Sequence, residues 1–401
     1  MQIPGGASVD AQRVGVGGQV ALLACGLFAT IGLFSPGLLL PQLEQAFAGT
    51  PNVDLLVPLV GTIASFSFAV AAPGVGALLA RFGCRAVIIP SLILLAVAGT
   101  APAMLDNLWA MVATRAVVGA AVAGVFTAGL TGIGSLSDAN RARMFGWYGV
   151  VGGATAILVF PAVGAIARTG WRLPFAIHLV ALLVLPLAFL LPKALGRAAR
   201  RAPGERRGES ANLFGPAMVG LLIVAAYAGM CMLLAPIYAP LYLGSLGITD
   251  TRLLAIPVTL SAVCAAISAA VYGPAQRFLG IAGVFAAILI GIGGVLLVAG
   301  TTDSVVIFCI ALGILGGLMG LVAPNISAAA LAAAPEKGGE AMGLANGVMF
   351  GSQLLFPFIA TWIRSQAGLG AVLLVFAAAA LGIGVTILAR MTVIRRRVVQ
   401  S

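Results

Sequence analysis

The sequence predicts an all-α membrane protein with twelve transmembrane helices in two pseudo-symmetric six-helix bundles. Of its 401 residues, 61% are hydrophobic and only 8% are charged, whereas a soluble globular domain carries about 25% charged residues. A bilayer is the solvent that tolerates so much apolar surface. The apolar runs have the length of a spanning helix, roughly 20 residues, and one polar segment divides the chain almost in half.

Charged residues and clusters of proline and glycine separate the apolar runs from one another. The first run is longer than the core of a signal peptide, which has about 7–15 residues, so we interpret it as a retained spanning helix. Prolines inside the runs are tolerated where neighbouring helices or water satisfy the freed carbonyls. The predicted spans are 18–42, 53–80, 86–104, 107–134, 143–167 and 173–192, then 213–243, 251–276, 280–300, 304–333, 339–363 and 369–391.

The domain organisation follows from the polar segment KALGRAARRAPGERRGES, residues 193–210. This segment is rich in basic residues and has no apolar periodicity, so it is typical of a solvated linker. We expect a bundle in residues 1–192, a cytoplasmic linker in 193–212, and a second bundle with a basic cytoplasmic tail in 213–401.

Positive charges gather on one predicted side of the membrane. With twelve spans, both termini and the five loops that follow even-numbered helices share a side, and most of the 22 Lys and Arg residues fall there. Because cytoplasmic loops carry the Lys/Arg excess, we expect a plasma-membrane protein, such as one of a bacterial inner membrane, with both termini cytoplasmic. The net charge of +11 then reflects this bias and contact of the tail with anionic lipid heads, and needs no nucleic-acid partner.

Glycines recur between the two halves at a constant spacing of 197 residues. Two similar six-helix units joined by a linker are what a transporter with two rocking domains needs. The matching pairs are Gly76 and Gly273, Gly83 and Gly280, Gly119 and Gly316, and Gly146 and Gly343.

Composition also excludes several function classes. The single histidine excludes a metal or haem site built on several imidazoles, and the five cysteines lie scattered in apolar runs without a CxxC motif. No phosphate-binding G-x-x-x-x-G-K-[ST] loop occurs, and no paired acid and base or metal cluster lies in the spans. We therefore expect no enzymatic activity, no metal and no cofactor.

The loop between the second and third spans carries the first family motif. The segment GALLARFGCR, residues 76–85, resembles the cytoplasmic loop signature of the major facilitator superfamily, G-x-L-x-D-R-x-G-R-[RK]. It departs at Ala80, where the family has Asp, and at Cys84, and a plain basic loop is the alternative interpretation. The resemblance implies the major facilitator fold and a cytoplasmic gate. The matching residues are Gly76, Leu78, Arg81, Gly83 and Arg85.

Two further segments resemble the same family. Arg115 and Gly119 match its R-x-x-x-G signature in the fourth helix. Residues 152–175 resemble the fifth-helix pattern of the drug-efflux branch, G…G-P-x-x-G-G followed by G-W-R-x-x-F, with departures at Phe160 and Ala165. That pattern marks exporters, so the resemblance implies a drug:proton antiporter.

Arg115 is a full charge within an apolar helix, LWAMVATRAVVGAAVAG, and no Asp or Glu lies inside any predicted span. A centred Arg costs about 2.5–3.5 kcal/mol on insertion scales, so it should face the bundle interior or water. Three roles stay open. Arg115 could bond carbonyls exposed by Pro36 or Pro161, it could bias a proton-coupled step as the resemblance implies, or it could bind an anionic group of the substrate.

Candidate sites for protons and cargo follow partly from chemistry and partly from the resemblance. His178 has a suitable unperturbed pKa, although an interfacial hydrogen-bonded role is the alternative, and Glu44 and Asp54 are candidates at an outer gate. The resemblance implies that helices 1, 4, 7 and 10 line the cavity; interhelical bonding or an interfacial tyrosine belt would explain the same residues. The candidates for cargo binding or coupling are Arg115, Thr30, Tyr227, Tyr238, Tyr242, Asn325, Asn346, Gln353, Trp147 and Tyr148.

The sequence therefore predicts a secondary active transporter that moves a small organic molecule by alternating access. The first hypothesis is proton-coupled efflux of an amphipathic or drug-like compound. The second is uptake or exchange of a small organic anion with Arg115 as ligand. A hypothesis from another class is a non-transporting membrane sensor or assembly factor. The expected partners are the small molecule, protons and membrane lipids, and we expect a monomer.

Overall fold

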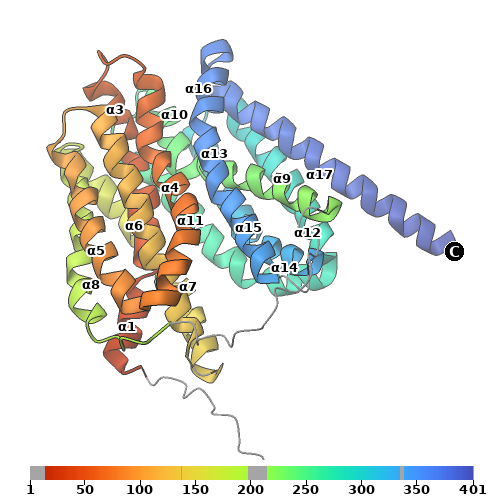
Figure 1. Ribbon diagram of the computed structural model, residues 1–401. Helices are drawn as coiled ribbons and strands as arrows, with labels where there is room; N and C mark the ends of the chain where they lie inside the picture. Colours follow the sequence, from red (N-terminus) through yellow and green to blue (C-terminus); the bar gives the residue numbers. More distant parts are fainter. Residues whose placement is uncertain (1–13, 137, 197–214, 335–337, 401) are drawn as a thin grey trace, which may run out of the picture.

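The computed structural model describes residues 14–136, 138–196, 215–334 and 338–400, and every regular element in them is helical (Figure 1). This confirms the predicted fold class. The elements of the first half are α1 (Val16–Ala24), α2 (Leu27–Ala29), η1 (Thr30–Phe34), η2 (Ser35–Leu39), α3 (Leu40–Ala46), α4 (Val53–Phe82), α5 (Cys84–Thr100), η3 (Ala101–Met104), α6 (Leu108–Gly134), α7 (Asp138–Ile166), η4 (Ala167–Thr169), η5 (Leu173–Leu179) and α8 (Val180–Ala188).

The second half repeats the pattern of long helices after the predicted linker, of which only residues 193–196 lie among the described residues. Its elements are α9 (Pro216–Cys231), η6 (Leu234–Tyr238), α10 (Ala239–Ser245), α11 (Thr251–Ala270), α12 (Tyr272–Thr301), α13 (Val305–Gly320), α14 (Val322–Ala333), α15 (Gly338–Gly351), η8 (Ser352–Leu354), α16 (Leu355–Ala367) and α17 (Leu369–Gln400).

Eleven segments of the described chain are long and apolar enough to cross a membrane, and the predicted sixth span contains a shorter apolar helix, Leu173–Ala188. That helix begins with the 3₁₀ segment η5, which has Pro174 in its first turn. The twelve predicted runs are thus found as helices. The largest difference in bounds is α17, which stays helical to Gln400 where the sequence predicted an end near 391.

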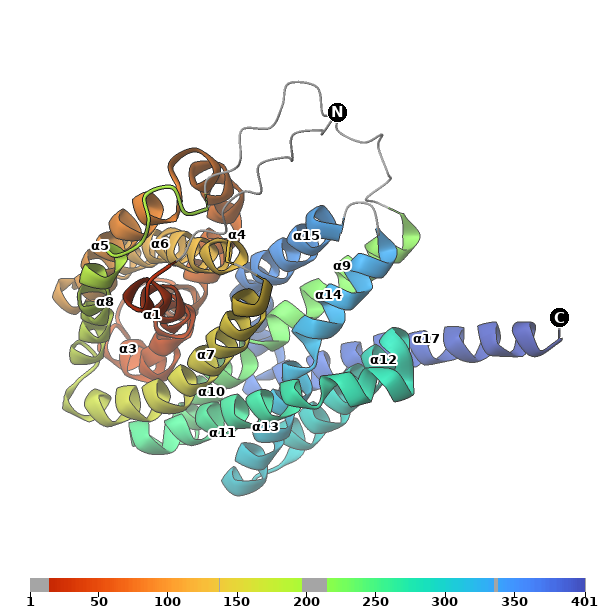
Figure 2. The ribbon, with the colours of Figure 1, turned by 90° about the horizontal axis from the view of Figure 1, so that it is seen from below.

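The helices run between two ends of the molecule. The start of α1, the end of α8 and α14 lie at one end, which we call the termini end, and α3, α10 and α16 lie at the far end (Figure 1). The last turns of α17 project away from the bundle in both views (Figures 1 and 2).

The glycine repeat corresponds to a repeated helix contact. A Cβ on Gly119 of α6 would lie 2.0 Å from the carbonyl oxygen of Ala64, and a Cβ on Gly316 of α13 would lie 2.2 Å from that of Ser261. All four residues obey the spacing of 197, because Ala64 and Ser261 are also related by it. Small residues let two helices approach closely in a membrane, so each half uses the same close crossing.

The first and seventh spans are both broken, and they cross where they break. A π-helical turn, η1, is followed by Pro36 in one, and η6 contains Pro236 in the other. A Cβ on Gly37 would lie 1.7 Å from the carbonyl oxygen of Pro236. Only glycine permits this approach, which joins the two halves at the centre of the molecule.

The halves are packed together from the far end to the middle and separate below it. One buried apolar cluster contains both Val60 of the first half and Ile237 of the second. The ring of Phe68, near the middle of α4, lies 5.1 Å from that of Phe350, near the end of α15. Nearer the termini end, a Cβ on Gly76 or Gly343 would meet no atom within 4 Å. The molecule is therefore closed between the halves at the far end.

Candidate transport site

Arg115 is fully buried in the first half, at the meeting point of four spans. Its Nε donates to the carbonyl oxygen of Val60 at 3.3 Å, and an Nη2–H donates to that of Gly32. Its Nη1 lies 3.4 Å from Nε2 of His178. The guanidinium thus ties α6 to α4, η1 and η5, with all three of its nitrogens engaged.

The chemistry of these acceptors explains why a cation is stable there without a carboxylate. Pro36 has no N–H, so the carbonyl of Gly32, four residues earlier, lacks its usual helical donor. His178 Nδ1 lies 2.9 Å from the carbonyl oxygen of Phe175, which only accepts, so Nδ1 carries the proton and the Nε2 lone pair accepts from Arg115. The partners of Arg115 are therefore two carbonyls and a neutral imidazole.

The two acids predicted at an outer gate, Glu44 and Asp54, and the acid Asp106 near the start of α6 lie apart from this cluster. Asp106 pairs with Arg172 at the surface, and Glu44 and Asp54 pair with Arg364. The arrangement matches the role in which Arg115 bonds a carbonyl exposed by Pro36. The roles in proton coupling and anion binding stay predictions.

A separate cavity of about 230 Å³ lies between the halves, which we call the central cavity. Thr30 and Phe160 line it from the first half, and Cys231, Ser261 and Met319 from the second. Its described lining carries no charged side chain. A small site bounded by methyl, thioether, aromatic and hydroxyl groups suits an apolar molecule with few polar atoms.

The three predicted tyrosines point into the second half. Tyr227 donates its hydroxyl to the carbonyl oxygen of Phe376 at 2.7 Å, and Tyr238 donates to that of Leu369. Tyr242 stacks on Phe308 with ring centroids 4.8 Å apart. None of the three is among the residues that line the central cavity. Their contacts hold α9, η6 and α10 against α13 and α17.

The predicted amides differ in their surroundings. Asn325 is buried between Tyr272, whose hydroxyl it accepts at 3.1 Å, and the carbonyl oxygen of Ile281. Gln353 is buried with its Oε1 unpaired, and its Nε2 lies 4.0 Å from the sulfur of Met232, which lines the central cavity. Asn346 is half-buried on α15, one turn from Phe350 on the face toward the first half.

The two predicted aromatic residues of α7 also separate. Trp147 is exposed, and Tyr148 is buried with its ring 5.7 Å from that of Phe126 and its hydroxyl unpaired. Of the predicted cargo residues, Thr30 lines the central cavity, and Gln353 contacts Met232, which lines it. The others form the surrounding bundle.

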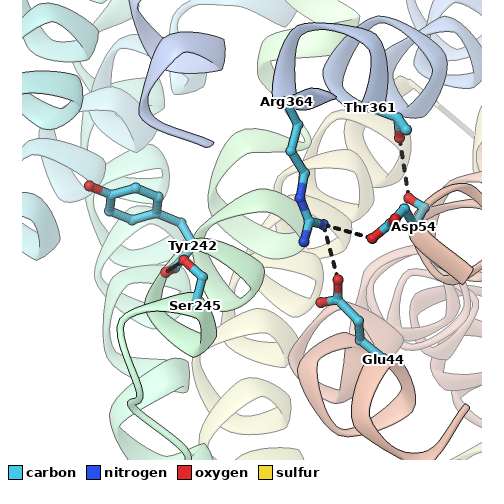
Figure 3. A network of polar contacts seen from close by, with 6 residues as sticks. All are labelled: Glu44, Asp54, Tyr242, Ser245, Thr361 and Arg364. Carbon is cyan, nitrogen blue, oxygen red and sulfur yellow. Dashed lines mark hydrogen bonds and ion pairs between the residues drawn. The ribbon is translucent and has the colours of Figure 1, made fainter. Parts of the chain in front are cut away.

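The far end holds the ion pairs that join the two halves in the described chain. Arg364, in the last turn of α16, lies 3.0 Å from Glu44 Oε1 and 3.5 Å from Asp54 Oδ1 (Figure 3). Thr361 donates to the carbonyl oxygen of Asp54 at 3.2 Å, an oxygen that lacks its helical donor because Pro58 follows four residues later. We call Glu44, Asp54, Thr361 and Arg364 the far-end network.

Figure 3 also places Tyr242 and Ser245 beside this network, with the Tyr242 ring directed away from the ion pairs. Sequence reasoning found the two acids but missed Arg364 and Thr361. Part of the signal was present, because Arg364 is predicted on the same side of the membrane as the two acids. The sequence did not single it out from Arg168, Arg172 and Arg252, which are predicted on that side too.

The loop motif lies at the termini end, between α4 and α5. Gly83 has φ 84°, a left-handed conformation that favours glycine, and Gly76 faces open space. The guanidinium of Arg81 lies 5.0 Å from the ring of Phe82, and that of Arg85 lies 5.3 Å from Phe189. The two arginines thus pack within the first half, and their predicted gating role stays a prediction.

Two helical halves that enclose a cavity at mid-membrane, closed on one side, define an integral membrane transporter. The chain belongs to the Major Facilitator Superfamily, which its residues 22–357 match. It is therefore a transporter of a small molecule and not an enzyme. No curated protein sequence matches the chain. A solved structure, the crystal structure of a D-xylose–proton symporter, is similar with a TM-score of 0.77 at 16% identity, over 92% of this chain and 96% of the symporter, which confirms the fold.

Proposed function

We propose that this protein exports a small, largely apolar and uncharged organic molecule across the plasma membrane, coupled to protons, as a monomer with both termini cytoplasmic. The observation that carries the proposal is the central cavity, whose described walls offer Thr30, Ser261 and Cys231 as their polar groups and no charge. An ionic cargo would leave its charge unpaired there, at a cost of several kcal/mol or more.

The burial of Arg115 supports an uncharged cargo over an organic anion. Its nitrogens are engaged by Gly32, Val60 and His178. An anion would have to displace these partners, and the Gly32 carbonyl would then have no donor. The resemblance of residues 152–175 to the efflux branch supports export. The expected cytoplasmic side is then the termini end, from which the cargo enters.

Two groups are candidates for proton coupling, the far-end network and His178, and they would have different roles. The far-end network sits at the rim, so its carboxylates meet protons from the far side only. A carried proton needs a group that both sides reach in turn. His178 is the candidate, and because its side chain is fully buried in this structure, it would have to become reachable in another state of the transport cycle. Protonating its Nε2 would place a cation against Arg115 and break their contact.

The test is transport by proteoliposomes with an imposed pH gradient, for uncharged, cationic and anionic aromatic compounds of matched size. Ala156 lines the central cavity, and Ala154 lies two residues away on the exposed side of α7. Ala156→Trp should abolish transport of the uncharged compound, and Ala154→Trp should retain it. Collapse of the pH gradient should stop uphill movement.

Two results would contradict the proposal. Transport of the anion alone, lost in a folded Arg115→Gln protein and unaffected by Ala156→Trp, would establish the anion carrier instead. The absence of transport for every compound, with the protein folded, would favour a sensor or assembly factor.

A further inference from the structure

A second and larger pocket, which we call the lateral pocket, lies inside the second half at the termini end. Its volume is about 640 Å³, and α9, α12, α14 and α17 supply its walls. It shares no lining residue with the central cavity. Ile223, at 56% exposure, stands on its rim. The volume falls within the usual range for ligand sites, about 300–1,000 Å³.

Two glycines that line the lateral pocket have leucines at the equivalent positions of the first half. At the spacing of 197 residues, Gly220 corresponds to Leu23 and Gly382 to Leu185. Both leucines pack against the buried core of the first half. A Cβ on either glycine would meet no atom within 4 Å. The two missing side chains therefore contribute to the empty space.

The first half also closes this end with its own chain. Leu195 is fully buried, and its carbonyl oxygen accepts the backbone N–H of Cys84 at 2.7 Å. Cys84 corresponds by the same spacing to Ile281, which lines the lateral pocket. After α8 the chain turns inward to supply Leu195, whereas α17 continues as a helix to Gln400. The second half thus lacks the apolar plug that the first half has.

The chemistry of the pocket selects the kind of molecule that replaces the plug. Its two polar side chains are those of Thr386 and Arg390. The Thr386 hydroxyl donates to the carbonyl oxygen of Gly382 at 2.7 Å, so it is not available to a ligand and the walls are apolar. Arg390 is exposed and is the one cation of the lining, at the end nearest the membrane surface. Three more arginines, 395–397, follow on the same helix.

We propose that the lateral pocket holds an acyl chain of an anionic phospholipid from the leaflet at the termini end, with its phosphate at Arg390. The chain supplies the apolar volume that Leu23, Leu185 and Leu195 supply in the first half. Basic pockets between transmembrane helices on the cytoplasmic side bind anionic headgroups in this way. The site is structural, and the lipid is not the cargo.

The test is native mass spectrometry of the purified full chain with added phosphatidylglycerol or phosphatidylcholine of the same acyl chains. Wild type should retain one phosphatidylglycerol at least fivefold more tightly than phosphatidylcholine. Arg390→Gln should remove the preference, and Gly220→Leu with Gly382→Leu should remove both lipids. Arg277→Gln, on α12 outside the pocket lining, is the matched charge control and should bind as wild type does.

Retention of lipid by the filled variant would overturn the proposal, as would equal losses in Arg390→Gln and Arg277→Gln. Displacement of the lipid by a transported compound would show that the pocket holds cargo. If the double leucine variant fails to fold, Ala332→Phe fills the same pocket from α14. Transport by Arg390→Gln in phosphatidylcholine vesicles separates this proposal from the proposed function, since either can fail alone.

Discussion

The two halves share one helical plan but hold themselves together by different chemistry. The first half has a buried cation, Arg115, tied to a broken helix, and its termini end is plugged by Leu195. At the position equivalent to Arg115 the second half has Leu312, which is also buried. The second half is held by hydroxyl bonds such as that of Tyr227, and it contains the lateral pocket.

The two halves therefore repeat one scaffold without repeating its interactions. Three hydrogen-bond acceptors converge on one arginine in the first half. The stability of this core therefore depends on the identity of that side chain. Apolar packing with neutral hydroxyl bonds in the second half is more tolerant of replacement.

The largest expected effect is on stability, when Arg115 and its equivalent in the second half, Leu312, are each replaced by methionine. Arg115→Met leaves the Gly32 carbonyl and the His178 Nε2 without their donor, at about 1–3 kcal/mol for each orphaned group. The Val60 carbonyl keeps its helical donor, the N–H of Ala64. Leu312→Met, the matched control, keeps volume and polarity and should cost less than about 1.5 kcal/mol. Thermal unfolding in detergent measures both. Equal losses would show that Arg115 contributes only volume.

The next effect concerns the crossing at which the halves touch. Gly37→Val places a side chain on the carbonyl of Pro236, so the far end cannot close as described. Transport should fall by about tenfold or more, equivalent to about 1.4 kcal/mol or more in the barrier. Gly149→Val, where a Cβ meets open space, should retain transport. Normal transport by the Gly37 variant would rule out this closed crossing.

A smaller effect is expected from the far-end network. Its partners are partly exposed, with side-chain exposures of 32% for Arg364 and 27% for Glu44, so the pair is worth about 1 kcal/mol or less. With Arg364→Gln, a cysteine introduced at the far end should react with a membrane-impermeant maleimide up to about fivefold faster. Arg172→Gln breaks the Asp106 pair within one half and should change nothing.

Removal of the two acids should act in the same direction as Arg364→Gln. The double variant Glu44→Gln with Asp54→Asn removes the negative charges that attract Arg364, so its far-end cysteine should be labelled about as fast as in Arg364→Gln. Labelling as slow as in the wild type would show that these ion pairs do not hold the far end closed.

The smallest effect separates two buried tyrosines. Tyr227→Phe removes a hydrogen bond to Phe376 and should destabilise the protein by about 0.6 kcal/mol, the average for such bonds in membranes. Tyr148 of the first half is buried with its hydroxyl unpaired, so Tyr148→Phe should be neutral or stabilising. The melting temperatures of the two variants, compared in one detergent, check this order.

The fold was predictable because apolar length, loop charge and glycine spacing are local properties of the sequence. The carbonyl partner created by Pro36 was also within reach, since proline removes a known donor. The contact of Arg115 with His178 was not, because it depends on how the sixth span packs on the fourth. The side on which Tyr227 and Tyr238 point was missed for the same reason: a helical pattern with apolar residues all around does not show which face meets the cavity.

In the proposed mechanism, cargo binds between halves that open to one side at a time. The most direct test is Thr30→Cys in a cysteine-free background, labelled by a membrane-impermeant maleimide added from either side. Thr30 lines the central cavity, so it should label from the termini side in the resting protein and gain labelling from the far side when Arg364→Gln is added. Labelling of Thr30→Cys from both sides at once at equal rates in the resting protein would contradict the account, because it would describe an open channel.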